Sequence, residues 1–168
     1  MQLAERYICT PVRLEDAETV SAIEQICFPP NEACTPEIMH QRVETITDAF
    51  MTVRLCSTDE PVGFINGLVS DEEDFRDDFF LHTELHDPSG SHVMIMGLDI
   101  LPEHRGQGLA SFLMKAFAAD QKSRGRTRLV LTCLEDRTEM YRHMGFTDHG
   151  IADSTWGGEV WHLMDMDL

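Results

Sequence analysis

The stretch Gly97-Leu-Asp-Ile-Leu-Pro-Glu-His-Arg-Gly-Gln-Gly-Leu-Ala-Ser111 decides how this chain folds. Its apolar first part predicts a buried strand that ends at Pro102, and a loop with one arginine and two glycines follows. Beyond the loop, apolar residues recur at the spacing of one helix face, at Leu109, Phe112, Leu113, Ala116 and Phe117. The order strand, glycine-rich loop and helix is therefore predicted here.

The loop itself predicts an anion site. The first four N–H groups of a helix lack partners within the helix, and the helix dipole is positive at that end. Gly106 and Gly108 let another molecule approach the backbone closely, and Arg105 adds a permanent positive charge. A phosphate or pyrophosphate suits such a site, and the alternative is a glycine turn that binds nothing.

Two common nucleotide loops are excluded by the residues at this position. No Gly-Lys-Ser/Thr is present, so the loop is not a nucleotide P-loop. Ser111 stands where the spacing Gly-x-Gly-x-x-Gly requires its third glycine, so the loop is not of the Rossmann type.

Composition predicts one globular domain over residues 1–168. The chain is 42% apolar, carries a net charge of −17 and has no apolar run long enough to span a membrane. Without a secretory signal we expect a cytoplasmic protein with no membrane partner, and its acidic field disfavours nucleic acid. Five scattered cysteines form no Cys-x-x-Cys pair, which predicts free thiols and no metal site.

The remaining patterns predict a mixed α/β fold with helices around one central sheet. Strands are predicted at 6–13, 50–56, 62–69, 93–101, 129–133, 146–152 and 159–166. Helices are predicted after Asp16, after Thr35-Pro36, over 109–123 and over 136–143. Residues 71–92 are predicted to form a long loop or a short helix.

Two motifs resemble the GCN5-related N-acetyltransferase (GNAT) superfamily. Arg105-Gly-Gln-Gly108-Leu-Ala110 is similar to the family's acetyl-CoA pyrophosphate loop, and Tyr141-Arg-His-Met-Gly-Phe146 is similar to the segment that ends its cofactor half. The predicted order of elements is similar across nearly the whole chain. The resemblance implies a GNAT fold, with a mostly antiparallel central sheet, one splayed pair of strands and flanking helices.

Within that superfamily the chain most resembles the arylalkylamine (serotonin) N-acetyltransferases. The similar segments are Leu131-Thr-Cys-Leu-Glu135, Gly157-Gly-Glu-Val-Trp161, and Phe28 followed by Cys34-Thr-Pro36. The resemblance implies direct acetyl transfer in a ternary complex to a primary amine, including small molecules of the arylalkylamine type. It implies a substrate pocket formed by Phe28, Met94, Met96, Thr132 and Trp161.

The same resemblance implies acetyl-CoA as co-substrate, without a metal. Implied contacts are Leu98, Asp99 and Ile100 on the central strand and Arg105, Gly106, Gln107, Gly108, Leu109, Ala110 and Ser111 at the loop. Gly97 lacks a side chain, so a ligand can approach the strand there. Tyr141 is implied beside the cofactor sulfur, where a phenol with an ordinary pKa of about 10 protonates the departing thiolate.

The general base departs from the pattern of the similar enzymes. They carry two histidines on the strand before the phosphate loop, whereas Met94 and Met96 stand at those positions here. Methionine accepts no proton, which leaves three hypotheses. The base is His92, which shares a strand face with Met94 and Met96 by the two-residue period, or it is His162 beside Trp161. Otherwise a chain of water molecules removes the proton.

Further alternatives stay open at the level of sequence. The acidic run 71–78 either rims a cleft that attracts amines or is a solvated loop. The basic residues from Lys115 to Arg128 either bind the phosphates of coenzyme A or belong to a solvated helix end. The alternative activities are a protein or peptide acetyltransferase, acting on N-terminal or lysyl amines, and a non-catalytic acyl-CoA sensor. Either a monomer or a homodimer is expected.

Overall fold

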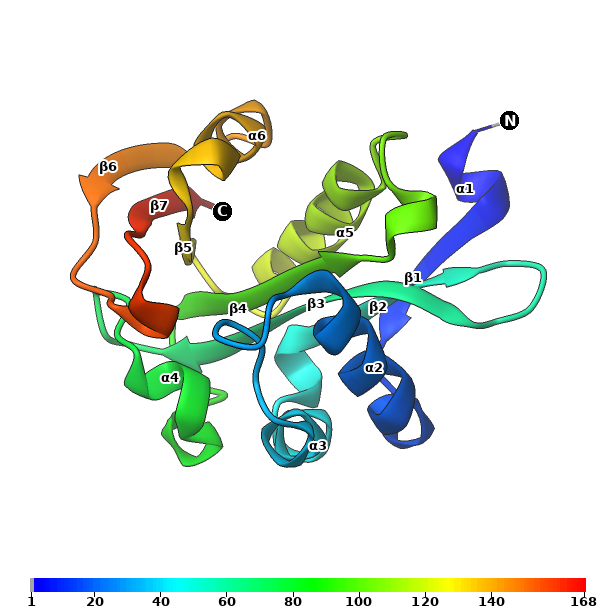
Figure 1. Ribbon diagram of the computed structural model, residues 1–168, viewed down its shortest axis with the longest axis horizontal. Helices are drawn as coiled ribbons and strands as arrows, with labels where there is room; N and C mark the ends of the chain where they lie inside the picture. Colours follow the sequence, from blue (N-terminus) through cyan, green and yellow to red (C-terminus); the bar gives the residue numbers. More distant parts are fainter. Residues whose placement is uncertain (1) are drawn as a thin grey trace.

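The sheet of the computed structural model, which describes residues 2–168, has the strand order β1-β2-β3-β4-β5-β7-β6 (Figure 1). Its strands are β1 (Tyr7–Pro11), β2 (Phe50–Leu55), β3 (Pro61–Ser70), β4 (His92–Ile100), β5 (Arg128–Cys133), β6 (Thr147–Ile151) and β7 (His162–Asp167). Neighbouring strands are antiparallel except β4 and β5, which are parallel. The predicted mixed α/β fold with a mostly antiparallel sheet is confirmed.

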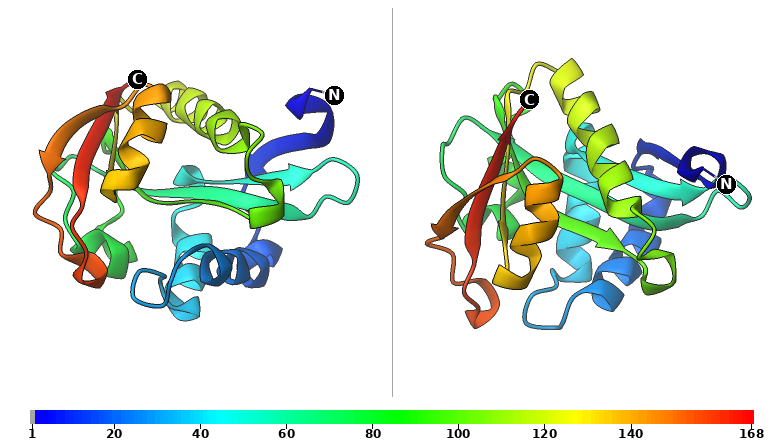
Figure 2. Two further views of the ribbon diagram at one scale, coloured as in Figure 1. Left: turned by 45° about the horizontal axis from the view of Figure 1, so that its top comes forward. Right: turned by 90° about the horizontal axis from the view of Figure 1, so that it is seen from above.

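Helices cover both faces of this sheet. They are α1 (Leu3–Arg6), α2 (Ala17–Cys27), α3 (Pro36–Thr45), α4 (Asp78–Leu81), α5 (Leu109–Ser123) and α6 (Thr138–His143). Short 3₁₀ turns lie at Leu14–Asp16, Thr47–Ala49, Thr83–Leu85, Pro102–His104, Glu135–Arg137 and Trp156–Gly158. Figures 1 and 2 show α2, α3 and α4 on one face and α5 and α6 on the other. Within residues 2–168, no helix combines the length and the apolar character that crossing a membrane requires.

Apolar helix faces hold the layers together as the sequence predicts. The face of α5 with Leu109, Leu113 and Phe117 packs on one side of the sheet, and Val20 and Ile23 of α2 pack on the other. Each such buried side chain stabilises the fold by about 1.5–3 kcal/mol relative to exposure. The short helix α1 was not predicted, because four residues are too few to show a helical period.

The strands β4 and β5 diverge halfway along β4. They pair over only four residues, from His92 opposite Arg128 to Ile95 opposite Leu131. On the other edge of β4, the register with β3 shifts so that Met96 becomes an extra residue. Such a β-bulge bends its strand. Beyond it, the edge of β4 that faces β5 is open.

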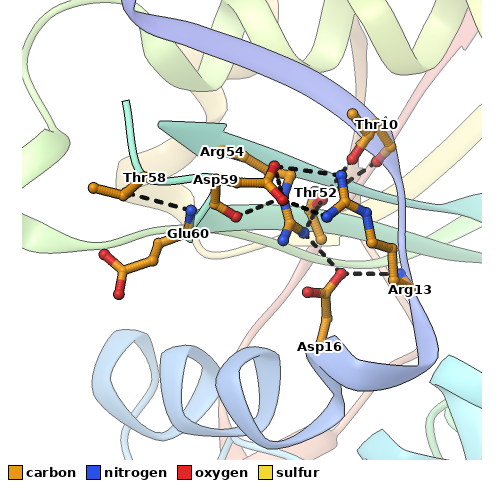
Figure 3. A network of polar contacts seen from close by, with 8 residues as sticks. All are labelled: Thr10, Arg13, Asp16, Thr52, Arg54, Thr58, Asp59 and Glu60. Atoms are coloured by element: carbon orange, nitrogen blue, oxygen red, sulfur yellow. Dashed lines mark hydrogen bonds and ion pairs between the residues drawn. The ribbon is translucent and has the colours of Figure 1, made fainter. Parts of the chain in front are cut away.

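A buried ion pair fixes the start of α2 against β2. The Arg54 guanidinium, 4% exposed, donates to Asp16 Oδ2 at 2.8 Å and to Asp59 Oδ1 at 3.0 Å (Figure 3). The same Asp16 oxygen accepts a hydrogen bond of 2.9 Å from the backbone N–H of Arg13. Because Asp16 immediately precedes α2, this network fixes where that helix begins.

Candidate active site

The gap between β4 and β5 opens into a cavity of about 590 Å³. From the face covered by α5, the cavity is lined by residues of the loop and first turn, including Gly106, Gly108 and Ser111. From the opposite face it is lined by residues of α2, α3 and the loops beside them. Its aromatic lining consists of Phe28, Phe80, Tyr141, Trp156 and Trp161. The cavity therefore joins the predicted anion loop to an aromatic chamber across the sheet.

The anion loop has the backbone that its glycines predict. Gly106 has φ +75° and Gly108, the N-cap of α5, has φ +85°, and no other atom lies within 4 Å of where a Cβ would stand at either residue. The glycines are thus required by backbone conformation and leave the helix start accessible. The Nε of Arg105 donates to the carbonyl oxygen of Ile100 at 2.7 Å, which fixes the arginine beside the loop.

Most of the predicted cofactor contacts line the cavity, namely Leu98, Asp99, Ile100, Arg105, Gly106, Gly108, Leu109, Ala110 and Ser111. Gln107 is not among the lining residues. Its Nε2 donates to Tyr7 Oη at 3.0 Å and to the His104 carbonyl oxygen at 2.8 Å. The side chain of Gln107 therefore stabilises the loop through contacts outside the cavity lining.

The basic residues near the end of α5 are engaged by carboxylates. Arg126 lies 2.6 Å from Asp48, Arg128 lies 2.8 Å from Asp165, and Arg124 pairs with Asp120. The 15 residues of α5 separate this end from the anion loop by about 22 Å. These arginines stabilise the fold, so the hypothesis that they bind coenzyme A phosphates is not supported.

Two carboxyl groups are buried beside the bend of β4. Asp99 is 1% exposed and Glu24, on α2, is 4% exposed. Glu24 Oε1 accepts a hydrogen bond of 3.2 Å from the backbone N–H of Cys34. Glu24 Oε2 and both oxygens of Asp99 have no partner within residues 2–168. Burial, together with the adjacent Glu24, raises the pKa of Asp99 well above its usual value. Because two adjacent buried carboxyls do not both ionise readily, the pair retains a proton and offers one negative charge.

Three acceptor oxygens converge beside Gly97, which has no side chain. A Cβ at Gly97 would lie 3.2 Å from Asp99 Oδ1, 3.4 Å from Asn66 Oδ1 and 3.7 Å from Glu24 Oε2. Asn66 lies opposite Gly97 in the β3–β4 register, and its Oδ1 also lacks a partner in the part of the chain that the structure describes. Three acceptor oxygens so close together suit a group with several N–H donors, such as an amine or ammonium. We call this arrangement of Gly97, Asn66, Glu24 and Asp99 the oxygen cradle.

Tyr141, the predicted proton donor, lines the cavity from α6. Its ring packs edge to face against Phe146, with the ring centroids 5.7 Å apart. Burial raises the pKa of the phenol. At neutral pH the hydroxyl is therefore protonated and able to donate.

The predicted substrate residues divide into two groups. Phe28, Met96, Thr132 and Trp161 line the cavity, whereas Met94 is buried in a separate core cluster with Phe75 and Phe79. His92 does not line the cavity either. It begins β4, its Nδ1 lies 2.8 Å from the carbonyl oxygen of Glu72, and the cavity lining on this strand starts at Ile95. His92 is therefore not placed to deprotonate a molecule in the cavity.

The acidic run of residues 71–78 does not rim this cavity, because none of its residues is among the lining residues. Arg76 bridges Glu72 and Asp78, and Asp77 accepts a hydrogen bond from the backbone N–H of Thr155. The run therefore ties the chain after β3 to the loop before β7, and the hypothesis that it attracts the substrate is not supported.

Among the lining residues that sequence reasoning missed are Glu24, Arg42, Phe80 and Trp156. A signal for Glu24 existed, since it follows Val20 by four residues and so stands on the buried face of α2. Phe80 and Trp156 stack with centroids 4.6 Å apart, a contact between distant segments that leaves no local pattern.

The thiols that line the cavity stay protonated. Burial raises the pKa of Cys133 to about 12 and that of Cys34 to about 11. Cys133 is a buried free thiol, and a thiol with this pKa is a poor nucleophile at neutral pH. In residues 2–168, no group of three or more His, Cys, Asp or Glu side chains is arranged to hold a metal ion.

Comparison with known proteins identifies a family and a set of similar folds. Residues 17–146 match the Acetyltransferase (GNAT) family. The loading GNATL domain of CurA from Lyngbya majuscula has a TM-score of 0.81 at 19% identity, over 96% of this chain and 97% of that chain. The GphF GNAT-like decarboxylase, in complex with isobutyryl-CoA, has a TM-score of 0.76 at 18% identity, over 96% and 98% of the two chains. The yncA protein from Salmonella typhimurium, solved with its cofactor acetyl-CoA, has a TM-score of 0.67 at 13% identity, over 96% and 94%. No curated protein matches the sequence significantly.

The buried carboxyl pair predicts that this site lowers the stability of the fold at neutral pH. Because the pKa of Asp99 is raised on folding, the folded protein binds a proton that the unfolded chain releases above a pKa of about 3.9. Stability attributable to Asp99 is therefore present at low pH and is lost as pH rises towards its folded-state pKa. Asp99→Asn should raise the free energy of unfolding at pH 7, as measured by urea denaturation, with a gain that shrinks as pH approaches 4.

Asp148→Asn is the matched control with the opposite sign. A hydrogen bond from the Gly150 N–H and the neighbouring His162 lower the pKa of Asp148, so its replacement should cost stability at pH 7. A loss of stability in both variants at pH 7 would contradict the assignment of Asp99 as a strained buried carboxyl.

Proposed function

Because the chain belongs to the acetyltransferase (GNAT) family, we propose that it transfers the acetyl group of acetyl-CoA to a primary amine. The oxygen cradle is the observation that supports an amine as the acceptor. Its three buried oxygens converge beside Gly97 and have no partners in residues 2–168. An amine nitrogen supplies the N–H donors that these oxygens need. Glu24, Gly97 and Asp99 of the cradle line the same cavity as the anion loop, so donor and acceptor can meet within it.

Acetyl-CoA as the donor is supported by relatives and by this chain's own backbone. yncA is solved with acetyl-CoA and GphF with isobutyryl-CoA. In this chain the loop 105–111 would hold the pyrophosphate at the start of α5. The edge of β4 beyond Ile95 is no longer paired with β5. Backbone groups alternate between the two edges of a strand, and the Leu101 N–H is bonded to Val62 on β3, so Leu98 and Ile100 are the residues that offer N–H and C=O groups to the amides of the pantetheine arm.

The transfer needs a neutral amine and a proton for the sulfur. An ammonium in the oxygen cradle loses a proton to the Glu24–Asp99 pair, and the neutral nitrogen attacks the thioester carbonyl carbon. As the C–N bond forms and the C–S bond breaks, the phenol of Tyr141 gives its proton to the departing thiolate, and the surplus proton on the new amide nitrogen passes to the phenolate and restores the phenol. Unpaired N–H groups of β4 stabilise the negative oxygen of the tetrahedral intermediate. No covalent intermediate with the protein is required.

The acceptor that fits best is a small molecule with a flat apolar body, as in arylalkylamines. Phe80, Trp156 and Trp161 give the chamber aromatic walls. Trp156 Nε1 donates to the Glu32 carbonyl oxygen at 2.9 Å, and Asn31 Nδ2 donates to that of Gly157 at 3.0 Å. These contacts join the loop after α2 to the loop before β7, and they favour a small molecule over a folded protein as acceptor.

The anion loop generates a test of donor binding. Gly108→Val forces a side chain into a left-handed backbone at the start of α5, so the loop should lose its affinity for the pyrophosphate. Saturating acetyl-CoA should raise the melting temperature of the wild-type protein and leave that of Gly108→Val unchanged.

Gly125→Val is the matched control, because Gly125 has φ +86°, also with no other atom within 4 Å of its Cβ position, at the far end of α5. Its strain should lower stability similarly while acetyl-CoA still raises its melting temperature. Equal stabilisation of the two variants by acetyl-CoA would contradict the assignment of the loop.

The proton donor is tested by turnover. Thiol release from acetyl-CoA is measured across arylalkylamines, polyamines and basic peptides, and the best acceptor is then used with Tyr141→Phe. We expect kcat to fall by about 10- to 1,000-fold, the range for one acid–base group, with acetyl-CoA affinity nearly unchanged.

Tyr7→Phe removes the chain's other phenol, which bonds His104 and Gln107 outside the cavity lining, and should keep its kcat. An unchanged kcat in folded Tyr141→Phe would reduce Tyr141 to a packing residue. Failure of every amine to release thiol would favour an acyl-CoA sensor instead.

A further inference from the structure

Arg42, on α3, is a buried cation without a carboxylate partner in the structure of residues 2–168. Three arginines of the chain are buried, and Arg42 is the least exposed of them at 2%. Arg54 pairs with Asp16 at 2.8 Å, and Arg126 pairs with Asp48 at 2.6 Å. An unpaired buried charge is strongly destabilising. Arg42 lacks a carboxylate partner although carboxylates are in excess in this chain, which has a net charge of −17.

The guanidinium of Arg42 has capacity for another partner. Its Nη2 donates to the carbonyl oxygen of Phe80 at 2.9 Å, whereas its buried Nε has no partner in residues 2–168. A guanidinium carries five N–H donors in one plane and binds carboxylates with two parallel hydrogen bonds. Among the three buried arginines, Arg42 is the one that lines the cavity.

Arg42 lies on the acceptor side of the cavity. It comes from α3, on the face of the sheet opposite α5 and its anion loop (Figure 1). The positive charge of Arg42 and the negative charge of Glu24 both act on the Cys34 thiol, lowering and raising its pKa respectively. The guanidinium lines the same cavity as Glu24 and Asp99, yet it forms no ion pair with either carboxyl.

We propose that Arg42 binds a carboxylate of the acceptor, so that the substrate is an amine that also carries a carboxylate, as amino acids do. This inference rests on the proposed amine acetylation and names its substrate class. The ammonium occupies the oxygen cradle, the carboxylate pairs with Arg42, and the aromatic walls take the side chain. A zwitterion satisfies both buried charges of the protein at once.

Matched pairs of acceptors test the proposal. Phenylalanine and leucine are each compared with the amine that lacks the carboxylate, 2-phenylethylamine and 3-methylbutylamine. We expect kcat/KM to favour the amino acids by about 10- to 100-fold, the value of a hydrogen-bonded charge. In Arg42→Gln the preference should disappear, chiefly through a raised KM, whereas Arg42→Lys, which keeps the charge, should retain part of it.

Binding provides a readout independent of turnover. The chain has two tryptophans, Trp156 and Trp161, and both line the cavity, so intrinsic fluorescence reports its occupancy. With coenzyme A present, phenylalanine should titrate this signal more tightly than 2-phenylethylamine in the wild type and equally weakly in Arg42→Gln. Arg137→Gln is the control, because Arg137 also lines the cavity but is exposed, and its variant should keep the preference.

The outcomes separate the two proposals. Equal or better use of the amines without a carboxylate, or a preference that survives in Arg42→Gln, overturns the role of Arg42 while leaving amine acetylation intact. If Arg42→Gln does not fold, the role of Arg42 is tested by the wild-type preference for amino acids and by its partial retention in Arg42→Lys. A further outcome is that the wild-type protein decarboxylates malonyl-CoA and Arg42→Gln loses this activity. The carboxylate that pairs with Arg42 would then belong to the acyl donor, and the inference would fail. No thiol release with any amine overturns both proposals.

Discussion

The short pairing of β4 with β5 is the constraint on which the rest of the site depends. Four residues of each strand form a parallel ladder, and the bulge at Met96 then bends β4 away. If the ladder continued to Ile100, the backbone groups of β4 would be consumed within the sheet, and no passage would join its two faces. The divergence places the anion loop of α5 on one face in reach of the buried groups of α2 and α3 on the other.

The buried charged groups of this protein are of two kinds, those paired within the fold and those with unpaired atoms. Where Arg54 meets Asp16, both charges are paired, and the pair fixes α2 in position. In the cavity, by contrast, Glu24, Asp99 and Arg42 are buried with donor or acceptor atoms that lack partners within residues 2–168. Unsatisfied buried polar atoms lower stability. Others lie elsewhere in residues 2–168, on His40, Gln121 and Arg126, but those of Glu24, Asp99 and Arg42 share one cavity, where a polar ligand can supply the missing partners.

The sequence was most informative where the chemistry is local. The loop between β4 and α5 and the setting of Tyr141 each lie within a few consecutive residues, so spacing and resemblance sufficed to predict that they belong to the site. The oxygen cradle could not be predicted this way, because Glu24, Asn66 and Asp99 come from three elements that only the tertiary fold brings together.

The main error concerns where along β4 the cavity begins. The two-residue period holds from His92 to Met96, since Met94 and Met96 pack against the same apolar cluster, and the bulge shifts the faces only beyond Met96. Met94 lies where β4 still pairs with β5 and is buried in the core, whereas Met96 follows the last paired residue and lines the cavity. His92 is at the far end of the strand. Asp99 was predicted for its backbone, although its side chain is the group with the unusual environment.

Substitution of Gly97 tests the oxygen cradle most directly. The Cβ of Gly97→Ala would stand 3.2 Å from Asp99 Oδ1 and 3.7 Å from Glu24 Oε2, so it would crowd the oxygens that are proposed to bind the amine without touching the anion loop. The measurement is kcat/KM for the best amine together with the acetyl-CoA-induced rise in melting temperature. The account predicts a loss of roughly 100-fold in kcat/KM, as expected for a misplaced nucleophile, with the rise in melting temperature retained. An unchanged kcat/KM in Gly97→Ala would contradict it.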